Sequence, residues 1–217
     1  MAVIYYPSCK FTAFSPDTSS NISEYLAKRY GMIIEGCCRP NHLKMTKEDT
    51  AVCICNTCSA ICSEDSNATV KSIWEILQDD DEFPFPDLHH EKMTLQDCWR
   101  CYDSRAEQDA VRKILKKMNV DIVELEENHE KTRFCGTSVH IPLVKENGMY
   151  APKRFIEDAE GMFIPKTSEE QKELMVKHCE LITTDKVVCY CVPCTKGIRI
   201  GGKQGIHLMD LMLGKEK

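Results

Sequence analysis

Cysteine is the residue type in this chain with the most potential for chemistry, and it recurs in an ordered layout. The chain holds 14 cysteines among 217 residues. In the first half a single cysteine, an adjacent pair and a C-x-x-C pair each follow a short apolar run; these are Cys9, Cys37-Cys38 and Cys55-x-x-Cys58. The second half repeats the order with Cys98, Cys135 and Cys191-x-x-Cys194. Cysteines gathered in this way typically hold a metal ion or a metal–sulfur cluster.

The elements that must position these cysteines are predicted to alternate between strand and helix. Short apolar runs predict strands at 3–6, 32–36, 51–54, 93–97, 121–126 and 186–190. Apolar residues at helical spacing predict helices at 21–31, 56–78 (with a break near Ser66), 104–120 and 168–179. Strands separated by helices imply right-handed crossovers and parallel pairing. We therefore expect an α/β fold of two similar lobes from internal duplication, each a small, mostly parallel sheet flanked by helices.

The predicted lobes are separated by an acidic, proline-containing stretch. Residues 79–87 read DDDEFPFPD, and Pro84 and Pro86 cannot continue a helix. The predicted organisation is a first cysteine-rich lobe over 1–80, a linker over 81–92 and a second cysteine-rich lobe over 93–217.

Parallel strands explain how distant cysteines can meet. The loops that leave the carboxyl ends of parallel strands lie along one edge of the sheet, where ligands bind. Cys55 and Cys191 are each predicted at the start of a helix, whose free N–H groups favour a thiolate. Trp99 and Arg100 directly follow Cys98 and could form a wall of a site.

The twofold order of cysteine, cysteine pair and C-x-x-C resembles the cysteine-rich CCG domain. This domain occurs in tandem in a redox subunit of heterodisulfide reductase, and the resemblance covers roughly residues 3–62 and 93–213. It implies that each complete motif supplies five cysteines to a noncubane [4Fe-4S] cluster that acts in disulfide cleavage. By position, the first cluster site consists of Cys9, Cys37, Cys38, Cys55 and Cys58, which would also be the redox centre.

This sequence departs from the CCG pattern at two places. Arg39-Pro40 stands where the first motif has glycine, and Phe134 replaces the first cysteine of the second pair, giving Phe-Cys-Gly. The second site is therefore reduced to the four candidate ligands Cys98, Cys135, Cys191 and Cys194. Four thiolates can hold an iron–sulfur cluster or zinc, or the site can be vestigial.

Five further cysteines have no fixed place in the motif. Cys101 forms a C-x-x-C pair with Cys98 and could replace it as a ligand. Cys62 lies one helical turn after Cys58 and is a reserve ligand or redox thiol. Cys53 and Cys189, within strand-like runs, and Cys179, at the end of a predicted helix, are expected to be structural.

Composition narrows the class of protein. The net charge of −6 argues against a nucleic-acid partner, which requires a basic face. No apolar run approaches the roughly 20 residues that span a bilayer, and no signal peptide is recognised. A cytoplasmic protein with reduced thiols is expected.

The favoured function is an iron–sulfur redox subunit of the heterodisulfide-reductase-like type, with a thiol or disulfide as substrate. It lacks nucleotide-binding motifs and would receive electrons from an iron–sulfur or flavin partner subunit. Two alternatives stay open. One is a zinc-binding structural or interaction protein without catalysis, and the other is a dithiol oxidoreductase that uses Cys191 and Cys194 directly.

Overall fold

A computed structural model describes residues 1–215 of the chain, which form two compact units. Within the described residues, the first unit comprises residues 1–76 and 143–161, and the second comprises residues 77–142 and 162–215. Each unit contains one four-stranded, fully parallel sheet with helices around it, so the predicted α/β class with two similar lobes is confirmed. Residues 143–161, which the sequence assigned to the second lobe, belong to the first compact unit. The proposed domain limits, with a linker over 81–92, stay a prediction.

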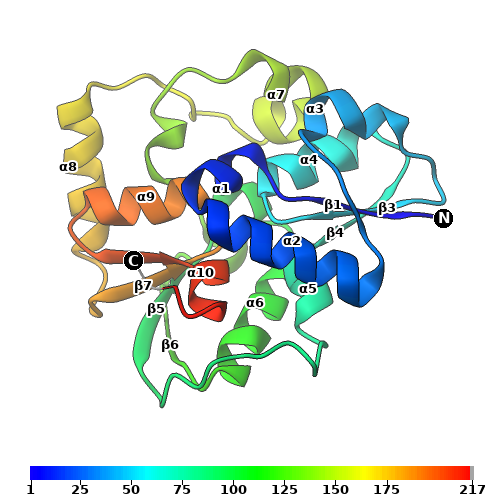
Figure 1. The fold of residues 1–217 in the computed structure, drawn as a ribbon. Coiled ribbons are helices and arrows are strands. Elements are labelled where there is room, and N and C mark those ends of the chain that lie inside the picture. The colour runs from blue at the N-terminus through cyan, green and yellow to red at the C-terminus, as the bar shows by residue number, and fades with distance from the viewer. Residues whose placement is uncertain (216–217) are drawn as a thin grey trace. The chain divides into compact units, whose positions relative to one another are not determined.

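The first unit is built on β1 (Val3–Tyr6), β2 (Ile33–Ile34), β3 (Thr50–Cys53) and β4 (Thr69–Ser72). The strands lie in the order β2-β1-β3-β4. Figure 1 shows helix α2 (Pro16–Tyr30) on one side of these strands and α4 (Asn56–Asp65) on the other. The short helices are α1 (Cys9–Phe14), α3 (Cys38–Asn41), η1 (His42–Lys44), α7 (Lys145–Tyr150) and η5 (Lys153–Glu157).

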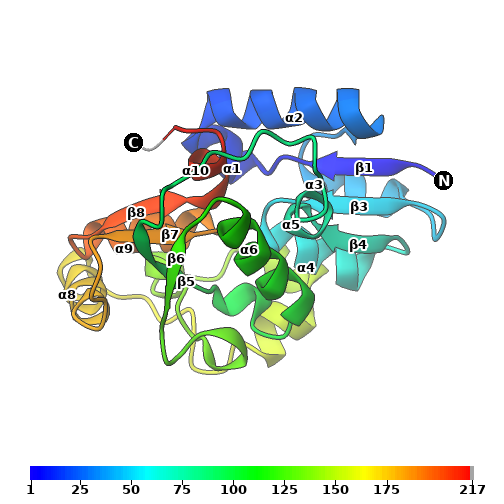
Figure 2. The same cartoon turned by 90° about the horizontal axis from the view of Figure 1, so that it is seen from below.

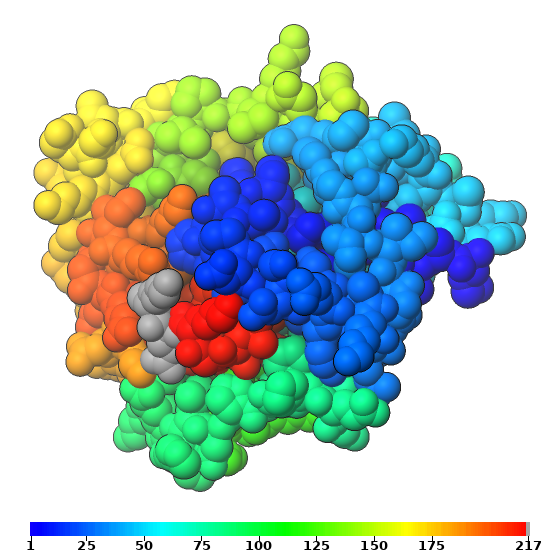
Figure 3. Space-filling view, viewed as in Figure 1, coloured from blue at the N-terminus to red at the C-terminus, as the bar shows by residue number. Residues whose placement is uncertain are grey.

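Helix α2 shows how local sequence sets an element. Pro16 is in its first turn, where a missing N–H costs nothing, and Gly31 ends it in the left-handed conformation with φ 65°. Ile22 and Leu26 lie on one face and are fully buried. The polar outer face of α2 is at the surface (Figure 3, blue).

The second unit repeats the topology with β5 (Lys92–Gln96), β6 (Asp121–Glu124), β7 (Lys186–Cys189) and β8 (Gln204–His207). Their order, β6-β5-β7-β8, is that of the first sheet. The longer helices are α6 (Arg105–Lys117), α8 (Ser168–Cys179) and α9 (Val192–Ile200); α6 and α9 lie on opposite sides of the strands (Figures 1 and 2). Shorter helical turns are η2 (Trp99–Cys101), η3 (His129–Lys131), η4 (Gly136–Val139) and α10 (Leu208–Met212).

Two strands were missed by the sequence analysis. The predicted helix 56–78 is instead α4, then β4, then α5 (Ile73–Leu77), and β8 lies after α9, where no strand was predicted. Both strands have only four residues and pair at the edge of a sheet, which leaves a weak sequence signal.

The strand order creates a switch point in each sheet. Crossovers run outward from β1 to β2 and from β3 to β4, so the loops after β1 and β3 diverge; the loops after β5 and β7 diverge in the same way. Ligand sites in open parallel sheets form in this crevice, beyond the carboxyl ends of the two central strands. Cys9 and Cys55 follow the central strands of the first unit, and Cys98 and Cys191 those of the second.

Candidate metal centre

Four buried cysteines converge at the switch point of the second sheet. Their sulfur atoms all lie within 4.8 Å of one another, and the four residues are Cys98, Cys135, Cys191 and Cys194. The Cys98 and Cys135 sulfurs are 3.4 Å apart, and those of Cys135 and Cys191 are 3.9 Å apart. This set matches the four candidate ligands of the second half, and it could hold a metal.

The sulfur spacing matches that of four thiolates around one tetrahedral ion. Metal–sulfur bonds of about 2.3 Å at the tetrahedral angle place neighbouring sulfurs about 3.8 Å apart. A four-iron cluster instead places a separate iron under each thiolate with sulfides between them, so its ligand sulfurs stand further apart. The donor set fits a thiolate-binding ion, and its geometry is close to that of a single-ion site.

Two glycines let the Cys135 loop approach helix α9. Gly136 has φ +55°, and a Cβ there would overlap the backbone carbonyl of Pro193. A Cβ on Gly197 would lie 2.5 Å from the Cα of Gly136. The Cys-Gly sequence at 135–136 therefore has a steric reason, because only glycine permits this contact.

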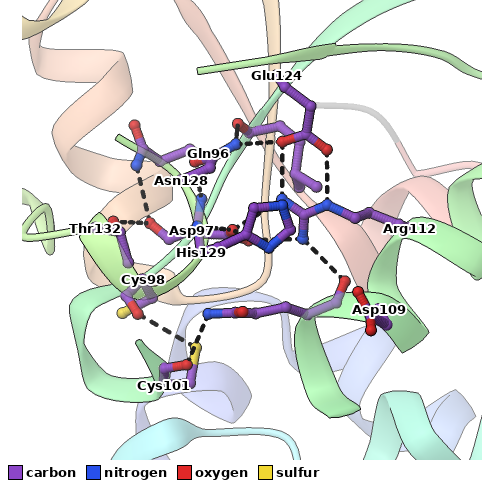
Figure 4. A network of polar contacts seen from close by, with 12 residues as sticks. Gln96, Asp97, Cys98, Cys101, Asp109, Arg112, Glu124, Asn128, His129 and Thr132 are labelled. Carbon is purple, nitrogen blue, oxygen red and sulfur yellow. Dashed lines mark hydrogen bonds and ion pairs between the residues drawn. The ribbon is translucent and has the colours of Figure 1, made fainter. Parts of the chain in front are cut away.

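The Asp97 side chain ties three ligand-bearing segments together, and Figure 4 shows it beside His129 and Arg112. Its carboxylate is fully buried and accepts hydrogen bonds from Tyr190 Oη at 2.7 Å and from the His129 backbone N–H at 2.8 Å. Tyr190 directly precedes Cys191, and Asp97 precedes Cys98. Arg112 neutralises the carboxylate, with Nη2 at 2.9 Å from Oδ2.

The backbone of Asp97 completes this link. Its N–H donates to Asn128 Oδ1 at 3.1 Å, and its carbonyl accepts from Thr132 Oγ1 at 3.2 Å (Figure 4). Asn128 and Thr132 lie in the loop that leads to Cys135. The positions of three ligands therefore depend on one residue that the sequence analysis did not select.

The sulfur environment favours the thiolate form of Cys135 and the thiol forms of Cys98 and Cys194. Burial opposes ionisation of Cys135, but hydrogen bonds from Cys191, Cys194 and Cys98, together with the charge of Arg100, hold its pKa well below the usual value. Burial raises the pKa of Cys98 and Cys194. An incoming cation must displace the protons of such thiols, so metal binding here would release protons.

Three of the extra cysteines in the second unit point elsewhere. The Cys101 thiol donates to the Cys98 carbonyl at 3.3 Å and to Tyr190 Oη at 3.4 Å, so Cys98 rather than Cys101 belongs to the four-sulfur set. Cys189 is fully buried in β7. Cys179 donates to the Ile198 carbonyl at 3.6 Å, between α8 and α9.

The second unit also has a pocket of about 350 Å³ beside the Cys135 loop. One wall is the stacked ring pair Phe134 and His178, whose centroids are 3.9 Å apart. His178 Nε2 bonds Gln96 Oε1, and burial lowers the His178 pKa to about 4, so the ring is neutral. Phe134, which precedes Cys135, thus packs as an aromatic wall.

The five predicted ligands of the first unit are arranged less tightly. Cys9 is exposed, Cys37 and Cys55 are half-buried, and Cys38 and Cys58 are buried. In the part of the chain that the structure describes, no three of them gather closely enough to form a ligand set like that of the second unit. Their role as ligands of one cluster stays a prediction.

Part of that set is nevertheless in contact. The Cys58 thiol interacts through hydrogen bonding with the sulfurs of Cys38 and Cys55, and this interaction raises the pKa of Cys58. Hydrogen bonds from Cys58 hold the pKa of Cys55 well below its usual value, although burial opposes this, and the Ser8 hydroxyl adds to the effect. Ser8 has φ 63°, an uncommon conformation for a non-glycine residue, immediately before Cys9.

Cys62 was predicted to be a reserve ligand or redox thiol. In the structure it is buried and interacts through hydrogen bonding with Cys53, which is buried as well.

Comparisons with known proteins returned no match to a family model, a curated protein or a solved structure. The resemblance to the CCG family therefore stays a proposal that rests on the cysteine layout. Across residues 1–215, none of the helices combines the length and apolarity needed to cross a bilayer.

Proposed function

We propose that the chain is a metal–thiolate redox protein that resembles the CCG-domain subunit of heterodisulfide reductase. The observation that carries the proposal is the set of four buried sulfurs within 4.8 Å in the second unit. The repeated strand order, with cysteines after the same strands in both units, supports a common origin of the two candidate centres. The finer assignment, a noncubane [4Fe-4S] cluster in the first unit, rests on the resemblance alone.

The two units would have different roles, because their cysteines differ in solvent exposure. An iron–sulfur cluster, when bound, supplies single-electron transfer. Cys9 is exposed and Cys55 is half-buried, so a small disulfide can reach the first unit. The four sulfurs of the second unit are buried and shielded from such a substrate. The first unit is therefore the proposed substrate side, and the second a protected centre.

The proposal also requires an electron donor. The sequence carries neither a Gly-rich dinucleotide fingerprint nor a phosphate loop, so we infer that electrons come from an iron–sulfur or flavin protein. The pure chain is expected to show little turnover with NADH or NADPH and a disulfide. Robust turnover without an added protein would contradict the need for a partner.

A structural zinc protein is the second candidate, and one observation favours it. The 3.4 and 3.9 Å sulfur separations bracket the value for one tetrahedral zinc ion, and a buried set of four cysteines is typical of closed structural sites. In this case the second unit would use the ion for folding energy and would have no catalytic role.

Metal analysis separates the two candidates. The full chain, purified without oxygen, is assayed for iron, acid-labile sulfide and zinc, together with the variants Cys58→Ser and Cys194→Ser. The redox proposal predicts iron and sulfide in similar amounts, lost in Cys58→Ser. One zinc with no sulfide, lost only in Cys194→Ser, would support the structural candidate and overturn the redox function. Absence of any bound metal would overturn both.

A further inference from the structure

A buried arginine lies in direct contact with one of the four sulfurs, that of Cys135. Arg100, in η2, is 5% exposed and follows Cys98 by two residues. Its Nη1 donates a hydrogen bond to the Cys135 sulfur at 2.5 Å. N–H groups that donate to ligand sulfurs, and the net charge around them, set the redox properties of metal–thiolate centres.

The other arm of the guanidinium fixes its orientation. Nη2 donates to Ser138 Oγ at 3.2 Å, and Ser138 Oγ donates to the Cys135 carbonyl at 2.7 Å. Arg100 thus connects the segment that carries Cys98 to the loop that carries Cys135. The planar, two-armed guanidinium suits this geometry, and the compact ammonium of lysine does not.

Charge gives this contact a consequence for the ion. Four thiolates around a divalent ion carry a net charge of −2, and around a trivalent ion −1. A buried positive charge stabilises the more negative state more strongly, because Coulomb energies are large where water is excluded. The contact therefore acts differently on the two oxidation states of a redox metal.

We propose that the charge of Arg100, held beside the Cys135 sulfur, biases this centre toward its divalent, reduced state. The inference rests on the proposed metal site in the second unit but not on the cluster assigned to the first. Reduction of a bound ferric ion takes up one electron from an added reductant and leaves all four metal–sulfur bonds intact. The guanidinium stabilises the product charge of that step.

A purely structural role for Arg100 makes a different prediction. If the residue only pinned the Cys135 loop, its loss would weaken binding of every divalent ion without changing the relative stability of the two oxidation states. Ser138→Ala is the matched control, because it removes the structural link and leaves the Arg100 charge in place. Arg100→Lys keeps the charge and gives up the two-armed geometry.

The test uses the full chain loaded without oxygen with ferrous iron alone, in a Cys58→Ser background that removes a first-unit ligand. The reduction potential of the iron and the affinity for Co²⁺ are measured for wild-type Arg100, Arg100→Gln, Arg100→Lys and Ser138→Ala. Arg100→Gln is expected to lower the potential by at least about 59 mV, equal to a tenfold shift in the ratio of the two states. Ser138→Ala is expected to leave the potential unchanged.

Several outcomes would overturn the inference. One is an unchanged potential in Arg100→Gln, and another is an equal fall in Ser138→Ala. If Arg100→Gln does not fold, the Arg100→Lys variant decides between the two roles. An unchanged reduction potential with weaker Co²⁺ binding supports the charge role. A reduction potential lowered by about 59 mV or more, which is a tenfold shift in the ratio of the two oxidation states, contradicts it. Failure of the protein with Arg100 intact to bind either ion would overturn the metal site as well, so the two failures are distinguishable.

Discussion

The two units of this chain use the same sheet order and place their first cysteine after equivalent strands, but the two segments that carry the later cysteines differ. In the second unit Gly136 follows Cys135, and Gly197 lies three residues after Cys194. At the same offsets in the first unit stand Arg39, after Cys38, and the buried Ile61, after Cys58. The pair of glycines that permits loop and helix to touch has no counterpart there.

The presence of two glycines in one unit and of larger residues in the other explains how a repeated cysteine motif can form two kinds of site. Arg39 stands where the second unit has Gly136, and its Nη2 donates to Asn147 Oδ1 at 2.7 Å, in helix α7 of the same unit. His42, four residues after Cys38, is held by the Cys38 carbonyl and by Asp65 Oδ2 at 2.8 Å. Side-chain contacts thus hold this segment of the first unit, and Cys9, Cys37 and Cys55 are not fully buried there.

Removing one cysteine from each unit in turn should give the largest difference in metal affinity between the two units. Cys194→Ser is expected to weaken Co²⁺ or Zn²⁺ binding at the compact site by more than the roughly ten- to hundredfold typical of outer contacts, because a donor itself is lost. Cys58→Ser is the matched change in the first unit and should leave that affinity intact. Competition titration against a chelator measures both, and equal losses would show that the four sulfurs are not a separate site.

The Asp97 link should be the next largest effect. Asp97→Asn removes the fully buried carboxylate of the Arg112 pair while Glu124 stays in place, so the expected loss of unfolding free energy is at the lower end of the range for breaking a buried pair, about 3 kcal/mol. Glu124→Gln removes the other carboxylate of the same arginine, which is 43% exposed, and should cost about 1 kcal/mol or less. Urea denaturation compares them. Similar losses in both variants would contradict the role given to Asp97.

The glycine contact gives a steric prediction. Gly136→Ala adds a Cβ that overlaps Pro193 at a positive φ, so strain and overpacking together should cost about 3 kcal/mol and weaken metal binding. Gly202→Ala is the control, because Gly202 has φ +91° but nothing within 4 Å, and should cost about 1 kcal/mol. Thermal unfolding and Co²⁺ titration test the pair. Equal costs would mean that the close approach is not required.

Stability should also fall in mild acid through His207. Burial lowers the pKa of this histidine to about 3, and its neutral Nδ1 accepts the Met209 N–H at 3.3 Å. The folded pKa lies below the unfolded value near 6.5, so the unfolded state takes up the proton first as the pH falls. Stability present above about pH 6.5 should decline by roughly 1.5 kcal/mol between about pH 6.5 and 5.

The check is chemical unfolding at several pH values in the chain and in His207→Gln. The variant is expected to lose about 1.5 kcal/mol of the decline and to keep the similar share that half-buried His178, with a pKa of about 4, contributes over the same range. The exposed His90 provides the control in His90→Gln, which should keep it. An unchanged slope in His207→Gln would rule out this histidine as the source.

Much of the fold was predictable because local signals agreed with the tertiary structure. The helix predicted at 168–179 has the same bounds in α8, with Thr167 forming a capping box with Glu170. Strands β4 and β8 were missed because residues such as Lys71 and Gln204 mask short edge strands. The return of residues 143–161 to the first unit depends on tertiary contacts, such as Arg39 with Asn147, that no local pattern encodes.

The candidate cysteine ligands of this site could be predicted from the sequence, but the buried residues that hold them in place could not. The order of Cys98, Cys135 and the 191–194 pair identified the four sulfurs, since loops at the ends of parallel strands must converge. The choice between Cys98 and Cys101 required the hydrogen bond of Cys101 to Tyr190. Asp97 is an ordinary acidic residue in the sequence, and its role appears only when its buried partners are known.

X-ray absorption at the metal edge tests the central claim most directly. The full chain, in the Cys58→Ser background, is loaded with one equivalent of Co²⁺ and compared with the same chain carrying Cys194→Ser. The account predicts four sulfur neighbours at about 2.3 Å around one ion, with no metal–metal distance, and loss of that signal in the variant. Fewer than four sulfurs, or an unchanged spectrum after Cys194→Ser, would contradict the assignment of Cys98, Cys135, Cys191 and Cys194 to one centre.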